Sequence, residues 1–235
     1  MQALAILVAG GSGSRMGADL PKQFLKLRDR PVLWHTLQRF QESELFANCV
    51  LVLPESEFDR ARELCQLRDF ALQNWLHITA GGDSRTASVR NGLAQAKQLS
   101  EDDSQTIVSI HDAVRPFVTH DMLRASIAAS METGSGVCAV PVKSSIRETL
   151  PDSSSRAVDR SRFYHVQTPQ SFRLDLLQQA YTELPDDSVV SDDATVFEQA
   201  GQPVTLVEGS YDNLKLTTPE DLFLAEQILQ RQEQA

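Results

Sequence analysis

Glycines and cations gather in one short stretch near the start of the chain, GGSGSRMGADLPKQF, residues 10–24. Successive glycine N–H groups can turn towards an oxyanion, because no Cβ blocks its approach. Arg15 adds a permanently charged planar fork, and Lys22 adds a mobile ammonium after Pro21. The stretch suits a bound phosphate chain. Taken alone, it also fits a solvated strand-to-helix turn with two surface cations.

Two familiar phosphate-binding loops do not match this stretch. Gly11 and Gly13 begin a G-x-G-x-x-G pattern, but Met16 stands where its third glycine belongs. The acidic residue expected at a strand end about 20 positions later is also missing. No glycine is followed at the P-loop spacing by Gly-Lys-Ser or Gly-Lys-Thr. A Rossmann dinucleotide site and a P-loop are therefore both disfavoured.

Further polar motifs follow apolar runs later in the chain: GGDSRTASV (81–89), HDAVRP (111–116) and DDA (192–194). The first is either a ligand-binding loop or only a loop and helix N-cap. Asp112 ends an apolar run, where a buried carboxylate is costly unless it is paired or binds a metal. Arg115 is either a ligand-binding residue or the ion-pair partner of Asp112. The Asp192-Asp193 pair suits the N-cap and first turn of a helix.

The elements that must position these groups alternate between strands and helices. Apolar runs closed by glycine or proline predict buried parallel strands, and apolar residues at helical spacing predict amphipathic helices. Pro31 is expected at the first position of its helix and Thr119 at an N-cap. The expected strands are 3–9, 48–54, 76–82 and 105–112, and the expected helices are 31–41, 56–67, 83–97 and 119–133.

The alternation is interrupted after a strand at residues 136–142. Two short strands around the turn-rich PDSSS (151–155) predict a hairpin that projects from the body. After it we expect helices at 173–184 and 192–201, a strand at 203–209 and a last helix from Thr218. The prediction is one α/β domain, residues 1–235, with a doubly wound, mostly parallel Rossmann-like sheet and a β-arm at 137–162. Ligands of such folds sit at the carboxyl ends of the strands, where these motifs lie.

Composition excludes several classes of function. The formal net charge of −10 argues against nonspecific binding of nucleic acid or of an anionic membrane. Cys49, Cys65 and Cys138 are few and far apart and form no CxxC pair, so neither a disulfide framework nor a zinc site is expected. The start, MQALAILVAGG, has no basic segment and too short an apolar run for a signal peptide. We expect a cytoplasmic protein.

Six motifs taken in order resemble the cytidylyltransferases, in particular those acting on 2-C-methyl-D-erythritol 4-phosphate in the non-mevalonate isoprenoid pathway. They are VAGGSGSRMG-x-x-x-PKQF, GG-x-SR-x-SV-x-NGL, HDAVRP, VDR with QTPQSF, DDA, and DN-x-K-x-T-x-PEDL, and they cover essentially the whole chain. The resemblance implies a nucleotidyltransferase fold whose β-arm crosses to a second subunit of a homodimer. It also implies attack of a polyol phosphate on the α-phosphorus of CTP, with Mg²⁺ as cofactor.

The resemblance also implies roles for individual residues. Arg15 and Lys22 stabilise the pentacoordinate α-phosphate and the leaving pyrophosphate, while Arg160 and Lys215 hold the acceptor. Arg85 lies either near the phosphates or in a structural ion pair. His111 needs no part as a base, because the acceptor phosphate is already ionised. The other implied roles are CTP binding by Ala9, Gly10, Gly11, Gly13, Gly82, Asp83, Ser88 and Asp112, acceptor binding by Ser145, Thr168 and Arg115, and Mg²⁺ binding by Asp112 and Asp212.

One departure from the family falls in the arm. The chain has Ser144-Ser145 where members more often carry an Asp-Thr pair, so a hydroxyl is kept and a carboxylate is lost. A cytidylyltransferase with another acceptor, such as ribitol 5-phosphate, is therefore the nearest alternative. More distant ones are a nucleotidylyltransferase that uses another base, and a silent nucleotide sensor. Retention of the four cations Arg15, Lys22, Arg160 and Lys215 argues against a sensor.

Overall fold

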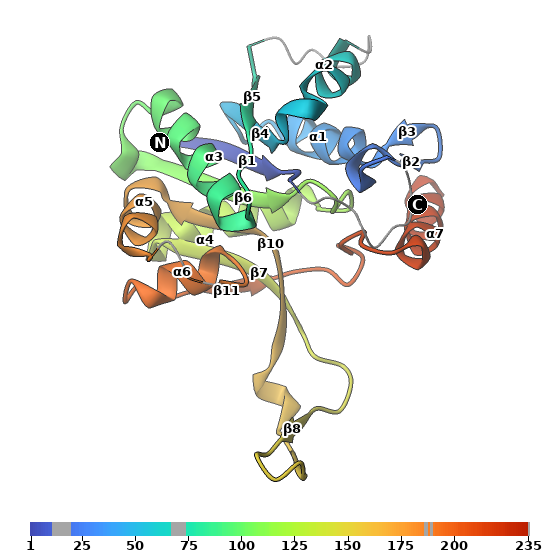
Figure 1. Cartoon of the computed structure of the whole chain (residues 1–235), viewed down its shortest axis with the longest axis vertical. Coiled ribbons are helices and arrows are strands. Elements are labelled where there is room, and N and C mark those ends of the chain that lie inside the picture. Colours follow the sequence, from blue (N-terminus) through green and yellow to red (C-terminus); the bar gives the residue numbers. More distant parts are fainter. Residues whose placement is uncertain (11–19, 67–73, 186–187, 189, 235) are drawn as a thin grey trace.

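A seven-stranded sheet forms the centre of the molecule, with strand order β11-β7-β10-β6-β1-β4-β5 (Figure 1). The computed structural model describes residues 1–10, 20–66, 74–185, 188 and 190–234. The strands of the sheet are β1 (Gln2–Val8), β4 (Asn48–Leu53), β5 (Leu76–Ala80), β6 (Thr106–Asp112), β7 (Ser135–Pro141), β10 (Tyr164–Arg173) and β11 (Leu206–Glu208).

Four neighbouring strands, β5, β4, β1 and β6, run parallel, as the apolar runs predicted. Val8 at the end of β1 lies opposite Val52 of β4 on one side and Asp112 of β6 on the other. The carboxyl ends of these strands therefore meet at one edge of the sheet. Chain segments leaving this edge are brought together wherever they lie in the sequence.

Helices cover both faces of the sheet, because its strands are apolar on both sides. Leu4 and Ile6 face one core and Ala5 and Leu7 the other. The core with Leu4 contains α3 (Arg85–Leu99), α5 (Leu174–Glu183) and α6 (Asp193–Gln199), and the core with Leu7 contains α1 (Val32–Glu42), α2 (Phe58–Gln66) and α4 (His120–Thr133). The mostly parallel, doubly wound α/β prediction is confirmed.

A third, smaller core attaches the last helix, α7 (Pro219–Glu233), to the body. Ala225 of α7 packs with Leu27, Val32, Phe117 and Leu216. Leu27 belongs to a short hairpin of β2 (Lys26–Leu27) and β3 (Arg30–Pro31), which the sequence did not predict. This core closes the side of the molecule next to the carboxyl edge of the sheet (Figure 1).

The helix starts follow the capping residues. Thr119 accepts a hydrogen bond from the Met122 N–H, as predicted, and Ser84 and Asp192 cap α3 and α6 in the same way. Pro31 is the N-cap residue of α1, because the helix begins at Val32. The side chains of Thr119, Ser84 and Asp192 each satisfy a helix N–H group that has no partner within the helix, whereas Pro31 makes no such bond.

Strand β10 was missed by the sequence analysis, which ended the arm at residue 162 and assigned no helix or strand to residues 164–172. It is antiparallel to β6 and to β7 and lies between them. Its buried positions are largely polar, so no apolar alternation marks it. Pro169 stands in the stretch between Val166 and Gln170 where the pairing register shifts, a position at which a strand tolerates proline.

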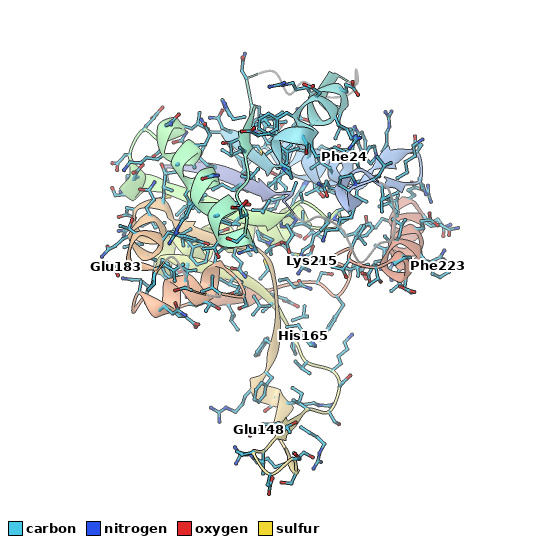
Figure 2. The ribbon with its side chains drawn as sticks, in the orientation of Figure 1. Phe24, Glu148, His165, Glu183, Lys215 and Phe223 are labelled. Atoms are coloured by element: carbon cyan, nitrogen blue, oxygen red, sulfur yellow. The ribbon has the colours of Figure 1, made fainter. Side chains whose placement is uncertain are left out.

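The β-arm leaves the body between β7 and β10 and ends in the predicted hairpin (Figure 1). The hairpin pairs β8 (Arg147–Thr149) with β9 (Ser155–Ala157). The predicted arm boundary at residue 137 is wrong, because residues 137–140 are buried in β7, between β11 and β10 of the sheet. The opposite end extends beyond residue 162, since Tyr164 and Val166 are still exposed. Figure 2 shows His165 on the stem below Lys215, and Glu148 near the tip at the far end of the arm.

Candidate active site

A cleft of about 280 Å³ opens at the carboxyl edge of the sheet. Segments from four distant parts of the sequence form it: residues 8–10 with 22–23, the turn between β5 and α3, the end of β6, and the segment before α7 that carries Lys215. Among the described residues, its lining consists of Val8, Ala9, Gly10, Lys22, Gln23, Gly82, Asp83, Ser84, Arg85, Ser88, Asp112, Val114 and Lys215. The fold thus brings together eight residues expected to bind CTP or to act in catalysis: Ala9, Gly10, Lys22, Gly82, Asp83, Ser88, Asp112 and Lys215.

Positive charge exceeds negative charge in this cleft. Lys22, Arg85 and Lys215 contribute three cations, while Asp83 and Asp112 contribute two carboxylates. The chain as a whole carries a net charge of −10, so the cleft is locally opposite in sign to the molecule. Such a site favours a polyanion over a neutral ligand.

Asp112 is the central carboxylate of the cleft. Its Oδ2 lies 3.0 Å from Arg115 Nε and 3.1 Å from Lys215 Nζ. Burial alone would raise the pKa of Asp112, but the charges of Lys215, Arg115 and Arg85 lower it below its usual value. Asp112 is therefore ionised at neutral pH. For Arg115, the structure contains the ion pair that the sequence left as one of two readings.

Thr168 and His111 fix the backbone at the end of β6. The Thr168 hydroxyl accepts a hydrogen bond from the Asp112 N–H at 3.1 Å and lies 3.1 Å from His111 Nδ1. His111 Nε2 lies 3.1 Å from the carbonyl of Arg115 and must donate to it, so Nδ1 accepts from Thr168. Burial lowers the pKa of His111 to about 4. The imidazole is neutral and fully buried, and Thr168 is buried instead of lining the cleft.

The expected cytosine site is built around Ser88. Its hydroxyl accepts from the Gly82 N–H at 3.1 Å and donates to the Ser84 carbonyl at 2.9 Å. A Cβ at Gly82 would lie 2.5 Å from that of Ala87, so only glycine fits there. Ser88 is 2% exposed, and its hydrogen bonds fix the backbone that forms the wall of the cleft. Asp83 is exposed at the rim.

Arg85 lines the cleft and also forms an ion pair. The two alternatives left open by the sequence, a place near the phosphates and a structural ion pair, are therefore compatible. Its two Nη atoms donate to Asp193 Oδ1 at 3.1 Å and Oδ2 at 2.5 Å. Tyr181 donates its hydroxyl to the same carboxylate at 2.6 Å. Asp192 is the N-cap of α6, as expected, but Asp193 has this additional function of holding an arginine at the cleft.

Several predicted site residues lie elsewhere or outside the described part of the chain. Gly11, Gly13 and Arg15 belong to residues 11–19, which are not described. Ser145 and Arg160 are exposed on the arm, where Arg160 donates to the carbonyl of Lys143. Asp212 does not line the cleft; its carboxylate pairs with Arg231 of α7.

Sequence reasoning missed three residues that support the site: Gln23, Asp193 and Asn213. Gln23 lines the cleft and donates from Nε2 to the carbonyl of Ala9 at 2.9 Å, which fixes the end of β1. It stands beside Lys22 in the PKQF motif, a signal that was available. The other two also lie in quoted motifs, Asp193 in DDA and Asn213 in DN-x-K, but their hydrogen-bonding partners are distant in the sequence, so their roles were not evident.

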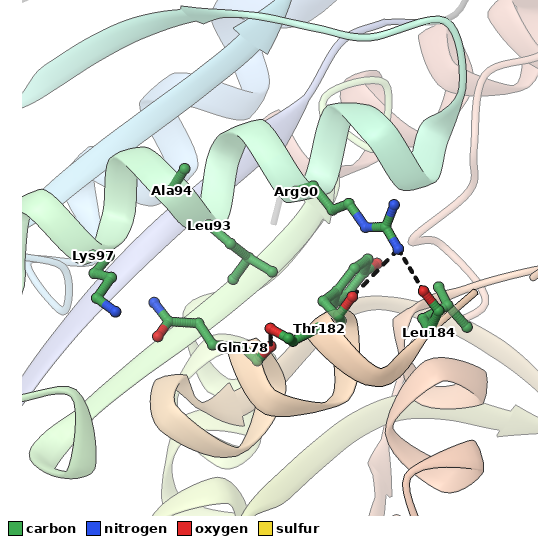
Figure 3. A pocket seen from close by; sticks show the side chains of 8 residues that line it. Arg90, Leu93, Ala94, Lys97, Gln178, Thr182 and Leu184 are labelled. Atoms are coloured by element: carbon green, nitrogen blue, oxygen red, sulfur yellow. Dashed lines mark hydrogen bonds between the residues drawn. The ribbon is translucent and has the colours of Figure 1, made fainter. Parts of the chain in front are cut away.

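A larger hollow of about 490 Å³ lies between α3 and α5 (Figure 3). Arg90 spans it and donates from Nη2 to the carbonyls of Tyr181 and Leu184, at 3.3 and 2.8 Å. These are carbonyl groups at the C-terminal end of α5, where a cation stabilises the helix. Its lining contains no carboxylate or imidazole among the described residues.

The open α/β sheet and the cationic cleft at its carboxyl edge define a protein of the nucleotidyltransferase-like α/β class. The sequence profile of the IspD family, 2-C-methyl-D-erythritol 4-phosphate cytidylyltransferase, matches residues 3–231. The chain belongs to this family.

Individual relatives agree over nearly the whole chain. The chain is 42% identical over 232 residues to the 2-C-methyl-D-erythritol 4-phosphate cytidylyltransferase of Syntrophus aciditrophicus, covering 98% of this chain and 97% of that one. To the enzyme of that name from Porphyromonas gingivalis it is 43% identical, with 96% of each chain covered.

Solved structures agree as well. The 4-diphosphocytidyl-2C-methyl-D-erythritol synthase of Anaerococcus prevotii superimposes with a TM-score of 0.82 at 26% identity, covering 97% of this chain and 96% of that one. The IspD of Francisella tularensis gives 0.78 at 26% identity, covering 97% and 100%. Among the described residues, no helix is long and apolar enough to cross a membrane.

Proposed function

We propose that this chain transfers the cytidylyl group of CTP to 2-C-methyl-D-erythritol 4-phosphate, in isoprenoid precursor biosynthesis. A phosphate oxygen of the acceptor forms a bond to the α-phosphorus, and the bond from that phosphorus to the bridging oxygen breaks. The products are 4-diphosphocytidyl-2-C-methyl-D-erythritol and pyrophosphate. The observation that carries the proposal is the cleft itself, in which Lys22, Arg85 and Lys215 converge at the edge of a nucleotidyltransferase-like sheet.

Positioning and charge neutralisation account for most of this chemistry. Lys22, with Arg15 as the resemblance implies, neutralises charge that develops on the α-phosphate and on pyrophosphate. The glycine-walled pocket of Gly82 and Ser88 accepts the pyrimidine ring. Lys215 binds the acceptor phosphate, held in place by Asp112 at 3.1 Å. No general base is needed, because the attacking oxygen is already ionised.

The donors in the cleft fit a Mg²⁺ ion that is bound mainly through the nucleotide. Magnesium in nucleotide sites commonly uses one or two carboxylates together with substrate phosphates. The cleft offers Asp112 and Asp83, and the described residues contain no group of three or more potential ligands that would hold a metal alone. The ion would neutralise phosphate charge and orient the triphosphate of the nucleotide. We propose Asp112 as its protein ligand, and Asp212, paired with Arg231, is the weaker candidate.

A homodimer would complete the acceptor site. Arg160 and Ser145 are on the arm, which extends away from the body of its own subunit (Figure 1). Phe163, Tyr164 and Val166 on the stem are 42–46% exposed, an unusual display of large apolar side chains. We propose that the arm packs on a second subunit and delivers Arg160 to that subunit's cleft. The buried free thiols of Cys49 and Cys138 support a reducing compartment, the cytoplasm.

Pyrophosphate release from CTP tests the proposal directly. Purified protein is supplied with Mg²⁺ and either 2-C-methyl-D-erythritol 4-phosphate or ribitol 5-phosphate. Turnover with the first acceptor alone is expected, with Ser144-Ser145 as a tolerated variation. Turnover only with ribitol 5-phosphate would overturn the acceptor assignment, and preference for another nucleotide would overturn the assignment of CTP.

A further inference from the structure

Lys215 stands in a segment with no helix or strand of its own, between the end of β11 at Glu208 and the start of α7 at Pro219. Two backbone bonds attach this segment to the body. The Gly209 N–H donates to the Ala139 carbonyl at 2.9 Å, and the Leu216 N–H donates to the Val114 carbonyl at 2.9 Å. Between these two points, side chains must fix the path of the backbone.

Asn213 is the buried side chain that does so. It is fully buried, and its Nδ2 donates to the carbonyl of Thr168 at 2.8 Å and to Gln167 Oε1 at 3.3 Å. The backbone carbonyl of Asn213 accepts a hydrogen bond from Arg115 Nη1 at 2.8 Å. Arg115 in turn donates from Nε to Asp112, the same carboxylate that Lys215 contacts. Asn213 is thus connected to both cations that contact Asp112. It accepts a hydrogen bond from Arg115, and it lies two residues before Lys215 in the chain.

Gln167 secures the same segment from the opposite side. Its Nε2 donates to the Ser210 carbonyl at 2.8 Å, and its Oε1 accepts from the Ser210 N–H at 3.3 Å. Gly209 leaves space for this side chain, since a Cβ there would lie 2.5 Å from Gln167 Oε1. The Gln167 amide therefore bonds both backbone polar groups of Ser210, as a neighbouring strand would do.

Gln167 and Thr168 lie where β10 enters the body from the arm. Val166 is 42% exposed on the stem, whereas Gln167 is 7% exposed. The next paired residue in β10 is Gln170, after the shift in register. The first buried residues of the arm's return strand are therefore the residues that hold the Lys215 segment.

We propose that Asn213 and Gln167 are positioning residues that set Lys215 against Asp112 and couple it to the root of the arm. The inference rests on the proposed role of Lys215 in binding the acceptor. Neither amide touches the cleft, so each acts only through the backbone that carries Lys215. A change at either residue should therefore affect the acceptor step and leave CTP binding in place.

The test uses Asn213→Ala and Asn213→Asp, each made in the wild-type chain and in a Lys215→Ala background. The aspartate has the shape of asparagine but cannot donate to either oxygen at neutral pH. We expect kcat/KM for the acceptor to fall on the order of 30-fold in both single variants, because losing the two hydrogen bonds that the buried amide donates shifts the position of a reacting group. The KM for CTP should change by less than about threefold.

Ser126→Ala is the matched control for a loss of stability. Ser126 is also fully buried, and its hydroxyl lies 2.6 Å from both the Gly136 carbonyl and Ser171 Oγ, away from the cleft. It should lower the melting temperature to a similar extent without changing the acceptor kinetics. An equal loss of acceptor kinetics in this control would show that the Asn213 effect is general destabilisation, and the inference would be overturned.

The Lys215→Ala background separates the inference from the proposed function. If Asn213 acts through Lys215, its replacement adds less than about threefold to the loss already caused by Lys215→Ala. If the double variant instead loses activity by the product of the two single losses, the inference is overturned and the role of Lys215 remains. Full turnover by Lys215→Ala alone would instead overturn the proposed role of Lys215.

Discussion

Asp193 holds Arg85 at the edge of the cleft through two parallel hydrogen bonds, at 3.1 and 2.5 Å. Asp193 is fully buried, and the Arg85 side chain is 27% exposed towards the cleft. Burial alone would lower the pKa of Arg85, but the charge of Asp193 raises it above its usual value. The pKa of Tyr181 is also raised, mainly by burial and to a smaller extent by the carboxylate of Asp193. One carboxylate of α6 thus fixes a cation that stands more than 100 residues earlier in the chain.

We expect Asp193→Asn to weaken both the fold and the binding of CTP. The amide cannot accept two charged bonds, so Arg85 loses its orientation, and unfolding should become easier by about 3 kcal/mol. Urea unfolding and the KM for CTP check the two effects. Tyr181→Phe is the control, because it keeps the ion pair and should cost about 1 kcal/mol with an unchanged KM. A normal KM in Asp193→Asn would contradict the role of Arg85 in the cleft.

Lys22→Ala should lower kcat far more than it changes the KM for CTP. A cation about 4 Å from an oxyanion contributes roughly 4 kcal/mol at an effective dielectric of 20. Its loss therefore corresponds to a decrease on the order of a thousandfold in turnover. Lys22→Arg retains the charge and should keep part of the rate. Turnover of Lys22→Ala close to that of the unaltered enzyme would exclude Lys22 from the reaction.

His111 should make the protein less stable in mildly acidic solution. Its folded-state pKa is lowered to about 4, so between pH 6.5 and 4 the unfolded chain binds more protons. Unfolding free energy should then fall by about 2 kcal/mol from pH 7.5 to pH 5. Asp112, whose folded-state pKa is lowered, stabilises above its unfolded pKa of about 4 and loses that effect only below this window.

Urea unfolding at the two pH values measures the effect of His111. In His111→Gln most of the difference should disappear, and the remaining part reports His35, whose pKa burial also lowers. The charged groups nearest to His111 are Asp112, Arg115 and Lys215, and they remain in the variant. An undiminished pH dependence in His111→Gln would contradict the assignment to His111.

Local signals were sufficient to predict most of the fold. Apolar runs marked β1, β4 and β6, and capping residues such as Thr119 marked helix starts, because both act within a few residues. Strand β10 was not predictable in this way. Its buried Gln170 accepts hydrogen bonds from the Asp193 and Ala194 N–H groups, and Ser171 lies 2.7 Å from Ser109 Oγ. Polar residues are buried there because distant segments satisfy them.

The same distinction holds in the candidate site. Arg115 and Asp112 are three residues apart, so their ion pair was an evident alternative from the sequence. Arg85 and Asp193 are 108 residues apart, and only the folded sheet brings them together. Family resemblance supplied the residues of the cleft, but not the buried side chains that orient them. Those side chains leave a recognisable pattern only in three dimensions.

Two inactive variants should restore activity together if the arm crosses between subunits. Arg160→Ala and Lys215→Ala chains, expressed in one cell, would form mixed dimers with one intact cleft in two. With random pairing, about a quarter of the normal activity should return. Each variant expressed alone sets the baseline. Activity no higher than that baseline would mean that Arg160 serves its own subunit or takes no part.

The arm tip interrupts a sheet whose strands are interleaved. If the chain is divided between β8 and β9, β7 falls in the first half, while its two neighbours, β10 and β11, fall in the second. Strand β10 in turn needs β6 and β7 of the first half on either side. Each half holds the missing hydrogen-bonding partners of the other. The tip is therefore the place at which this enzyme can be made as two separate polypeptides that recognise each other by strand insertion, with pyrophosphate production reporting their reunion.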